Sequence, residues 1–310
     1  MYDLIIIGGG TSGVTAGIYA ARKKIKTALV TKDFGGQIAE TGYVENWPGE
    51  QSILGVDLAK KWEDHMKKYN DVDIVEGDGV VEVDKKADQP YPVYTVTTTS
   101  GKKLDTKTLI VATGSTPRKL NIPGEKEYER KGVTYCSICD APLFKDKVVA
   151  VIGGGNAGFD TAIDLLAYAA KIFILEYNPT FRGDEATKEK LTASGKVEFI
   201  ANAQTASVKG EGFVTGITYK DRVTNEDKTL DVQGVFVAIG LVPDAGFMNN
   251  LVNLDERKYI VIDHKTNETS APGIFAAGDI TDIPFKQAVV SAGDGCNALL
   301  SAYEYLKKIK

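Results

Sequence analysis

The sequence predicts an α/β fold with two related halves, each built around a parallel β-sheet. A strand, a glycine-rich turn, a helix and a second strand follow one another over residues 4–30, and the same order recurs over residues 148–176. The strands of both copies, LIII and VVAVI among them, are continuous apolar runs, which is typical of parallel strands buried on both faces. Such an internal repeat indicates a duplicated structural unit.

Composition limits the class of protein. A chain of 310 residues with 43% hydrophobic and 25% charged residues suits a globular protein of two ordinary domains. Its formal net charge of -5 excludes a global basic field for nucleic acid or anionic lipid. No apolar run approaches the roughly 20 residues that span a bilayer, and the chain opens on a strand with no room for a signal peptide. We therefore expect a cytoplasmic protein with no membrane or nucleic-acid partner.

The remaining elements repeat in the same way. Each copy is followed by a short strand that ends in glycine, TLIVATG at 108–114 and GVFVAIG at 234–240. Alternating residues separated by turn residues predict antiparallel hairpins at 91–104 and 216–230. A further strand and turn follow at 271–282, and apolar residues at helical spacing predict an amphipathic helix from about Gln287 to Leu306.

The first glycine turn, with Gly8, Gly10 and Gly13, lies directly between a strand and a helix. In this context the first glycine makes the tight turn, the second lets the backbone approach a pyrophosphate, and the third packs helix against strand. The phosphate charge then lies at the helix N-terminus. The turn predicts a dinucleotide site; a tight turn without a ligand is the alternative.

The second glycine turn, with Gly153, Gly155 and Gly158, carries an additional acidic residue. Glu176 ends the second strand of this copy, about 20 residues after the turn, where a carboxylate can accept both hydroxyls of an adenosine ribose. The same carboxylate would repel a 2′-phosphate. The pattern predicts an NAD site, with a solvent-facing strand end as the alternative.

Cys136 and Cys139, two of the chain's three cysteines, form a C-x-x-C pair just before the second copy. Two dinucleotide sites indicate a flavin and a nicotinamide nucleotide with hydride passing between them, and a third redox centre is then needed for electrons to leave. Zinc would need two more ligands, and only Cys296, His65 and His264 remain. A redox dithiol is therefore favoured over a metal site or a buried structural pair.

The order of motifs resembles the low-molecular-weight thioredoxin reductases over essentially all 310 residues. GGQ at 35–37, ENWPG at 45–49, ATG at 112–114, CxxCD at 136–140 and PGIFAAGD at 272–279 appear in that family's order. GVTYC, CDAPLF, GLVPD and IPFKQ are similar to one branch, the C-terminal reductase portion of the alkyl hydroperoxide reductase flavoprotein. That flavoprotein carries a thioredoxin-like module at its N-terminus. We expect this module to be missing here, because residue 1 already lies at the first strand of the unit that would bind FAD.

The resemblance implies two Rossmann-like three-layer ββα dinucleotide-binding domains, the FAD/NAD(P)-linked disulfide reductase fold. A discontinuous FAD-binding domain covers 1–115 and 245–310, an inserted NAD(P)-binding domain with the redox CxxC covers 116–244, and the protein is a homodimer. The residues implied for FAD are Gly8, Gly10, Thr11, Ser12, Gly13, Asp33, Gly35, Gly36, Gln37, Asn46, Thr113, Gly114, Gly278, Asp279, Lys286, Gln287 and Ala288. Those implied for NAD are Gly153, Gly155, Asn156, Ala157, Gly158, Glu176 and Arg182.

Two departures from the family pattern matter. NADPH-using members carry a His-Arg-Arg sequence after the second strand, whereas this chain reads Glu176-Tyr177-Asn178 and offers Arg182 as the only nearby cation. NADH is therefore favoured over NADPH. The acid expected near the end of the FAD unit's second strand is replaced by Thr31-Lys32-Asp33. Asp33 is the expected substitute, with backbone contacts alone as the alternative.

The implied activity is flavin-dependent disulfide reduction. NADH reduces FAD, Cys139 receives the electrons, and Cys136 attacks the disulfide of a thioredoxin-like, glutaredoxin-like or peroxiredoxin-system protein. Asp140 donates and accepts the proton, or merely caps the following turn. A swing of the inserted domain is expected, with hinges at 114–117 and 240–245. The alternatives are a reductase fed by ferredoxin or reduced deazaflavin, and a non-catalytic flavin-binding redox sensor.

Overall fold

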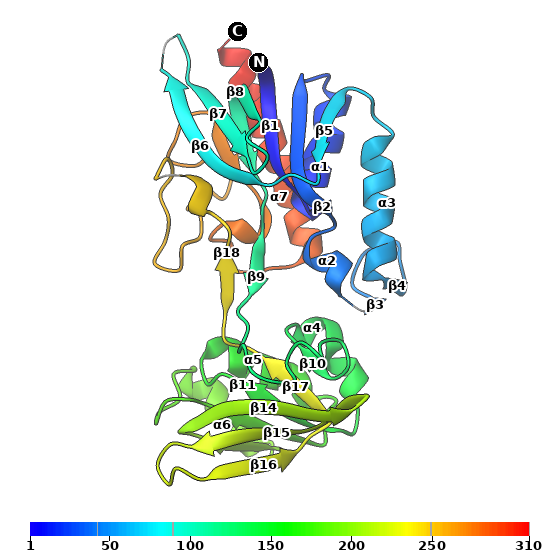
Figure 1. Ribbon diagram of the computed structural model, residues 1–310, viewed down its shortest axis with the longest axis vertical. Helices are drawn as coiled ribbons and strands as arrows, with labels where there is room; N and C mark the ends of the chain where they lie inside the picture. The colour runs from blue at the N-terminus through cyan, green and yellow to red at the C-terminus, as the bar shows by residue number, and fades with distance from the viewer. Residues whose placement is uncertain (42, 89, 249, 310) are drawn as a thin grey trace. The chain divides into compact units, whose positions relative to one another are not determined.

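A computed structural model of the chain describes all residues except 42, 89, 249 and 310 (Figure 1). It divides into two units, one formed by Met1–Thr116 with Val242–Lys310 and the other by Pro117–Leu241. The two connections between the units lie in strands β9 (Ser115–Pro117) and β18 (Leu241–Pro243), which pair with each other. The units are described one at a time below.

The first unit is a seven-stranded sheet with helices. The sheet runs β5-β2-β1-β8-β7-β6, and β19 pairs with β8. Besides the connecting strands, its elements are β1 (Tyr2–Gly9), α1 (Thr11–Arg22), β2 (Thr27–Phe34), α2 (Gln37–Glu40), β3 (Tyr43–Val44), β4 (Ile53–Leu54), α3 (Gly55–Lys67), β5 (Val72–Glu76), β6 (Val80–Ala87), β7 (Val93–Thr98), β8 (Lys103–Val111), η2 (Gly246–Met248), β19 (Ile274–Ala276), η3 (Gly278–Ile280) and α7 (Ala288–Lys308).

Alternating residues of β1 face two different cores, which makes the unit three layers deep. Leu4 and Ile6 pack with apolar residues of α1 and α7, whereas Ile5 and Ile7 pack with the layer that contains β6 and β7. Strand β8 joins the layers, because it pairs with β7 antiparallel and with β1 and β19 parallel. The apolar residues of β1 are therefore buried on both faces of the sheet, as the continuous apolar sequence of this strand requires. Figure 1 shows the red helix α7 beside the blue strands, although they lie at opposite ends of the chain.

The second unit repeats this plan. Its five-stranded parallel sheet runs β10-β17-β11-β12-β13, and β14-β15-β16 form a separate antiparallel sheet. Its elements are β10 (Val133–Thr134), α4 (Ser137–Asp140), η1 (Ala141–Phe144), β11 (Val148–Ile152), α5 (Asn156–Leu166), β12 (Lys171–Leu175), α6 (Glu185–Ala193), β13 (Val197–Ile200), β14 (Ala203–Glu211), β15 (Phe213–Asp221), β16 (Asp227–Asp231) and β17 (Gly234–Val237).

Strand β11 has the same two-sided burial as β1. Val149 and Val151 pack with Phe159 and Leu165 of α5, and Ala150 and Ile152 pack with residues of the antiparallel sheet. Helix, parallel sheet and antiparallel sheet thus form the three layers, and the predicted fold class is confirmed. The predicted hairpins are β7–β8 and β15–β16, and each is extended by a strand that the sequence pattern had not indicated, β6 or β14.

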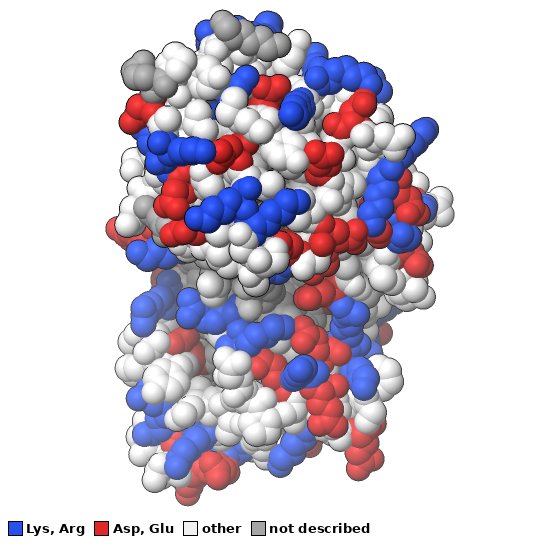
Figure 2. Space-filling model, turned by 45° about the horizontal axis from the view of Figure 1, so that its top comes forward, with Lys and Arg blue, Asp and Glu red and all other residues white. Residues whose placement is uncertain are grey.

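Charges of both signs are interspersed over the face shown in Figure 2, so no broad basic patch lies on that face. In the described part of the chain, no helix combines the length and apolar character needed to cross a membrane.

Tyr94 links strand β7 to the segment before β19 by a hydrogen bond, and its side chain is 1% exposed. Its hydroxyl donates to the carbonyl oxygen of Pro272 at 2.6 Å, two residues before β19. Burial raises the pKa of Tyr94 to about 12, so the hydroxyl keeps its proton at neutral pH.

We expect Tyr94→Phe to lower the free energy of unfolding by about 1 kcal/mol, because the hydrogen bond from the buried Tyr94 side chain to the carbonyl oxygen of Pro272 is lost. Chemical denaturation followed by circular dichroism measures the change. Tyr43→Phe, at a position that is 57% exposed, is the matched control and should change little. Equal effects of the two substitutions would contradict this account.

Candidate functional site

The first glycine turn leaves an open space where a ligand can approach. A Cβ atom on Gly8 would lie 2.3 Å from the carbonyl oxygen of Ala112, and one on Gly13 would lie 1.9 Å from that of Gly8. Neither position can hold a side chain. A Cβ on Gly10, at the N-terminus of α1, would meet nothing within 4 Å. Strand and helix are therefore packed as closely as glycine allows, while the helix N-terminus remains open to an anion.

The second glycine turn has the same steric pattern. A Cβ on Gly153 would lie 2.5 Å from the carbonyl oxygen of Ala238, and one on Gly158 would lie 1.8 Å from that of Gly153. Gly155, at the N-terminus of α5, again has nothing within 4 Å. Asn156 and Ala157 form the first turn of α5. The two turns are therefore equivalent sites in the two units.

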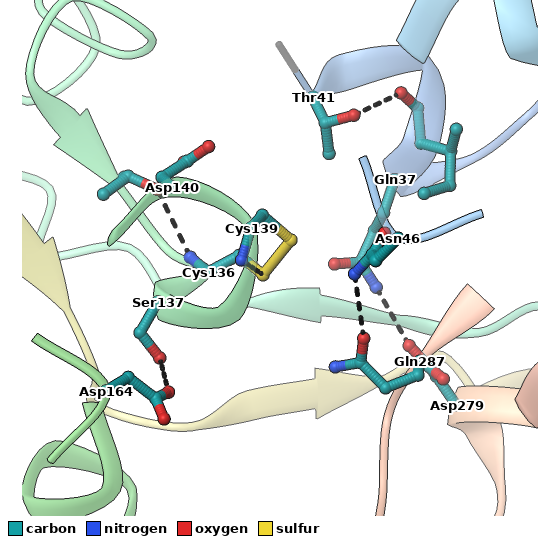
Figure 3. Close-up of a disulfide and its surroundings, with 12 residues drawn as sticks. Gln37, Thr41, Asn46, Cys136, Ser137, Cys139, Asp140, Asp164, Asp279 and Gln287 are labelled. Atoms are coloured by element: carbon teal, nitrogen blue, oxygen red, sulfur yellow. Dashed lines mark hydrogen bonds between the residues drawn. A yellow bond between two sulfur atoms is a disulfide. The ribbon is translucent and has the colours of Figure 1, made fainter. Parts of the chain in front are cut away.

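In the first unit, several of the side chains predicted to bind FAD lie around the half-buried carboxylate of Asp279 (Figure 3). Asp279 accepts a hydrogen bond from Oγ of Ser291 at 3.0 Å and one from Nε2 of Gln37 at 3.4 Å. Nζ of Lys286 donates to the Asp279 carbonyl oxygen at 3.3 Å. Burial raises the pKa of Asp279, against the opposing hydrogen bond from Ser291 and the charge of Lys286.

The same unit brings further predicted residues to this place. Nδ2 of Asn46 donates to Oε1 of Gln287 at 3.4 Å, just before α7 begins at Ala288. A Cβ on Gly278 would lie 2.9 Å from Oγ of Ser12, so this turn touches the start of α1. Ser291 was missed by the sequence reasoning; its position one turn into α7 was the available signal.

The other residues predicted to bind FAD lie around the first glycine turn. Thr11 begins α1, and the amide of Gly35 donates to the carbonyl oxygen of Gly9 at 2.9 Å. Asp33 has its carbonyl oxygen against Gly9, but its side chain is exposed. Thr113 Oγ1 donates to the carbonyl oxygen of Asp244. Gly36 and Gly114 both have positive φ, at 52° and 71°.

In the second unit, Cys136 and Cys139 form a disulfide with Cα atoms 5.3 Å apart (Figure 3). Cys136 is the N-cap residue of the short helix α4, and its Sγ accepts a hydrogen bond from the amide of Cys139 at 3.3 Å. Oγ of Ser137 donates to Oδ2 of Asp164 on α5 at 2.7 Å, which fixes the loop to the helix that follows the second glycine turn. Both cysteines are half-buried.

Asp140 lies beside the disulfide and is held by Thr134. The hydroxyl of Thr134 donates to Oδ2 of Asp140 and accepts a hydrogen bond from the amide of Cys136 at 3.3 Å. Burial raises the pKa of Asp140, and the Thr134 hydrogen bond opposes that rise only in part. Asp140 precedes η1, but its side chain makes no capping hydrogen bond, so the capping alternative is wrong. Thr134 was missed by the sequence reasoning, which carried no signal for it.

Glu176 faces the second glycine turn rather than solvent. It is 9% exposed, and its Oε2 accepts a hydrogen bond from the amide of Gly154 at 2.7 Å. Oε1 accepts from the amide and the side chain of Asn178, at 2.8 and 2.6 Å. A carboxylate offers about four acceptor positions, so three are filled from within the protein. The solvent-facing alternative is wrong, and the capacity left for ribose hydroxyls is smaller than the sequence indicated.

Two arginines lie close to the chain on either side of Glu176, Arg182 at the glycine turn and Arg222 at Tyr177. The amide of Arg182 donates to the carbonyl oxygen of Gly154 at 2.8 Å, while its side chain is exposed. Arg222, which follows β15, places its guanidinium 3.9 Å from the ring centroid of Tyr177, the residue after Glu176. The sequence had indicated Arg182 alone, and the structure adds Arg222 in contact with the residue that follows Glu176. Arg222 is 46 positions along the chain from Glu176 (222 − 176), and a local motif cannot reveal such a neighbour.

Within the residues that the structure describes, no three His, Cys, Asp or Glu side chains are gathered so that they could hold a metal ion. The third cysteine, Cys296 on α7, is a free, half-buried thiol.

Residues 2–295 match the model of the pyridine nucleotide-disulphide oxidoreductase family, and the chain belongs to that family. Membership implies a flavin cofactor. Among solved structures, a thioredoxin reductase from Streptococcus pyogenes is 32% identical, covers 99% of both chains and superposes with a TM-score of 0.90. Two such dinucleotide units thus define a disulfide reductase fold.

Two curated relatives narrow the resemblance. An alkyl hydroperoxide reductase component from Pseudomonas aeruginosa is 44% identical over 98% of this chain, and a Bacillus subtilis protein named NADH dehydrogenase is 41% identical over 98%. The chain spans 58% of the length of each. The resemblance to thioredoxin reductases and to the alkyl hydroperoxide reductase flavoprotein, inferred from the motifs, is confirmed.

The raised pKa of Asp140 predicts a pH-dependent effect of Asp140→Asn on stability. The native state keeps this proton at pH values where an unfolded aspartate, with a pKa of about 3.9, has already lost it. Native protein then binds more protons than unfolded protein, so the free energy of unfolding falls as pH rises through this window. The Asn variant has no such loss.

We therefore expect the stability of Asp140→Asn relative to the natural protein to increase as pH rises through the window, and to level off above it. Urea unfolding between about pH 4 and pH 8 measures the difference. Asp146→Asn, at an exposed carboxyl in the same unit, controls for the loss of one charge. A constant difference between Asp140→Asn and the natural protein would show that burial does not shift this carboxyl.

Proposed function

We propose that the chain is a flavin-dependent disulfide reductase. It takes electrons from a reduced nicotinamide nucleotide, with NADH favoured, and passes them through FAD and the Cys136–Cys139 dithiol to a disulfide in a partner protein. The first unit acts as the FAD-binding domain and the second as the nucleotide-binding domain, with 114–117 and 240–245 as hinges.

One observation carries this proposal. The disulfide lies in the unit that also holds the second glycine turn, and the half-buried Asp140, whose pKa is raised, lies beside it. A disulfide that serves only stability needs no proton donor. Reduction of a disulfide to a dithiol takes up two electrons and two protons, and Asp140 can supply one of those protons. The arrangement favours a redox role over the sensor alternative.

The two cysteines have different surroundings, which supports separate roles. The amide of Cys139 donates to Sγ of Cys136, and a hydrogen bond to a thiolate stabilises the charged form. We therefore assign Cys136 as the thiol that attacks the partner's disulfide and Cys139 as the one that receives electrons. Bound FAD supplies hydride acceptance from the nicotinamide and delivery of an electron pair.

The first unit fits FAD. The open N-terminus of α1 suits a pyrophosphate, and the Asp279 carboxylate retains acceptor capacity for a hydroxyl of the ribityl chain. Gln287, at the N-cap of α7, places a helix N-terminus where negative charge on the flavin ring would be stabilised. Purified protein should be yellow, with one non-covalent FAD per chain.

The partner is a thioredoxin-like, glutaredoxin-like or peroxiredoxin-system protein with a reducible disulfide, which is supported by relatives named thioredoxin reductase and alkyl hydroperoxide reductase. The working form is a cytoplasmic homodimer, a proposal that rests on the resemblance of the motifs to the family and on the composition. Light scattering at micromolar concentration tests the dimer.

Anaerobic titration with NADH, NADPH and reduced ferredoxin, followed by bleaching of the flavin absorbance, tests the electron donor. Rapid bleaching by NADH supports the proposal. Bleaching by ferredoxin alone would assign the chain to the ferredoxin-fed alternative. Absence of bleaching by any donor in flavin-loaded protein would leave only the sensor.

Cys136→Ser and Cys139→Ser should each abolish disulfide reduction, by more than about 100-fold, while FAD stays bound. Their absorption spectra should differ, because only Cys136→Ser retains the electron-receiving thiolate, which gives a long-wavelength band with oxidised flavin. Cys296→Ser is the matched control and should keep its activity. Appreciable activity of Cys136→Ser would remove the dithiol from the electron path.

NADH should exceed NADPH in kcat/KM by at least about tenfold. Loss of a charge-assisted hydrogen bond and repulsion between Glu176 and a 2′-phosphate together cost about 1.5–3 kcal/mol. Glu176→Ala should narrow the preference, mainly by weakening the use of NADH. Glu176→Gln removes the charge but keeps an acceptor for the Gly154 amide. It therefore distinguishes the effect of the charge on nucleotide preference from the effect of the hydrogen bond that supports the turn. Steady-state kinetics of all three proteins measures this, and equal use of both nucleotides by the natural protein would place the ribose away from Glu176.

A further inference from the structure

Arg222 is held at the carboxyl edge of the second unit's parallel sheet by three contacts. Its guanidinium lies 3.9 Å from the ring centroid of Tyr177, its Nη1 donates to the Tyr177 carbonyl oxygen at 2.8 Å, and its amide donates to the carbonyl oxygen of Asn202 at 2.8 Å. Arg222 is nevertheless exposed, and Tyr177 is 50% exposed. The pair is therefore an ordered planar surface open to a ligand.

A chain of hydrogen bonds connects Arg222 to Glu176. Beyond the Arg222–Asn202 bond, the amide of Asn202 donates to the carbonyl oxygen of Asn178 at 3.1 Å. Asn178 in turn donates twice to the Glu176 carboxylate. Strands β12 and β13 are paired at their last residues, Leu175 and Ile200, so the whole group lies at the carboxyl ends of neighbouring parallel strands. Ligands of open α/β sheets bind at that edge.

The turn that carries Arg222 is fixed before any ligand binds. Oδ1 of Asp221 accepts hydrogen bonds from the amides of Val223 and Thr224, at 2.9 and 3.2 Å, and Oδ2 accepts from Nζ of Lys228 at 2.6 Å. Those bonds, that of Lys228 foremost, lower the pKa of Asp221 to about 2. The carboxylate stays charged at neutral pH, and the arginine is presented by a preformed turn.

We infer that Arg222, stacked on Tyr177, is a specificity-determining residue that binds the adenosine end of the nucleotide. The purine ring stacks on the exposed face of the pair, one residue beyond the carboxylate that faces the ribose. The guanidinium charge also offsets part of the repulsion that Glu176 exerts on a 2′-phosphate. The inference rests on the proposed nucleotide site. It assigns to Arg222 the role of offsetting this repulsion, which the sequence analysis had given to Arg182.

Binding rather than turnover tests the role of Arg222, with 5′-AMP and adenosine 2′,5′-bisphosphate as probes in isothermal titration calorimetry. Arg222→Ala should weaken 5′-AMP about threefold, because a stacked cation at an exposed site is lost. It should weaken the bisphosphate a further fivefold or so, because an exposed ion pair with the 2′-phosphate is also lost. The preference for the unphosphorylated ribose therefore increases.

Arg222→Lys separates the two contributions. Lysine keeps the charge but not the planar stacking surface, so it should restore the bisphosphate-specific part and leave 5′-AMP weakened. Tyr177→Leu should weaken 5′-AMP to a similar extent, and the two substitutions combined should cost less than the sum of the single effects. Thermal unfolding of each variant monitors the hairpin.

Two controls make the outcome decisive. Arg182→Ala should change the ratio of the two affinities by less than about twofold. Lys147→Ala, which removes another cation over an aromatic ring in the same unit, should leave both affinities unchanged. The inference is overturned if Arg222→Ala binds both probes as the natural protein does, or if Arg182→Ala changes the ratio more. If the natural protein binds neither probe nor NADH, the proposed function itself fails.

Discussion

Among the described glycines of each unit, the one with the least room for a side chain lies in the first turn of a helix. At Gly13 and Gly158 the first turn of a helix lies so near the preceding glycine carbonyl that even a methyl group would clash with it. This approach aims the helix N-terminus along the edge of the sheet, and the edge is where the other predicted site residues gather. Removal of either glycine would shift the helix, and with it Ser12 in the first unit or Asn156 in the second.

Local patterns were enough to predict the elements that bury continuous apolar strands. Strands β1 and β11, helices α1 and α5, and the final helix α7 all lie where apolar periodicity indicated. Strands β6 and β14 were missed because much of each is exposed and polar, with KK at 85–86 and KGE at 209–211. Their place in the fold is decided by pairing with a neighbouring strand, which no single segment reveals.

The residues of the candidate site likewise fall into those that a local motif predicts and those that only the fold reveals. The glycine turns, the cysteine pair and Glu176 belong to short motifs with fixed spacing, and the sequence indicated them directly. Thr134, Ser291 and Arg222 act through partners brought to them by folding. Thr134 is only six residues from Asp140. A threonine on a buried strand is nevertheless common, so its presence alone does not indicate a functional residue. Arg222 is exposed and lies in a hairpin turn, where arginine is ordinarily solvated.

Glu176 shows how a single side chain can serve both structure and recognition. Its carboxylate accepts a hydrogen bond from the amide of Gly154 inside the glycine turn, and in the proposed function the same carboxylate faces the ribose. A substitution there affects the shape of the turn and the charge of the site together.

The paired strands β9 and β18 have a consequence for the modular history of the chain. The amide of Arg118 donates to the carbonyl oxygen of Gly240 at 2.9 Å, so the first and last residues of the second unit lie next to each other. A segment whose ends meet in this way can be gained or lost while the host chain is rerouted at a single point. The second unit can therefore be exchanged as one segment, and exchange of residues 117–241 between homologues would transfer the disulfide and the proposed adenosine-binding surface together.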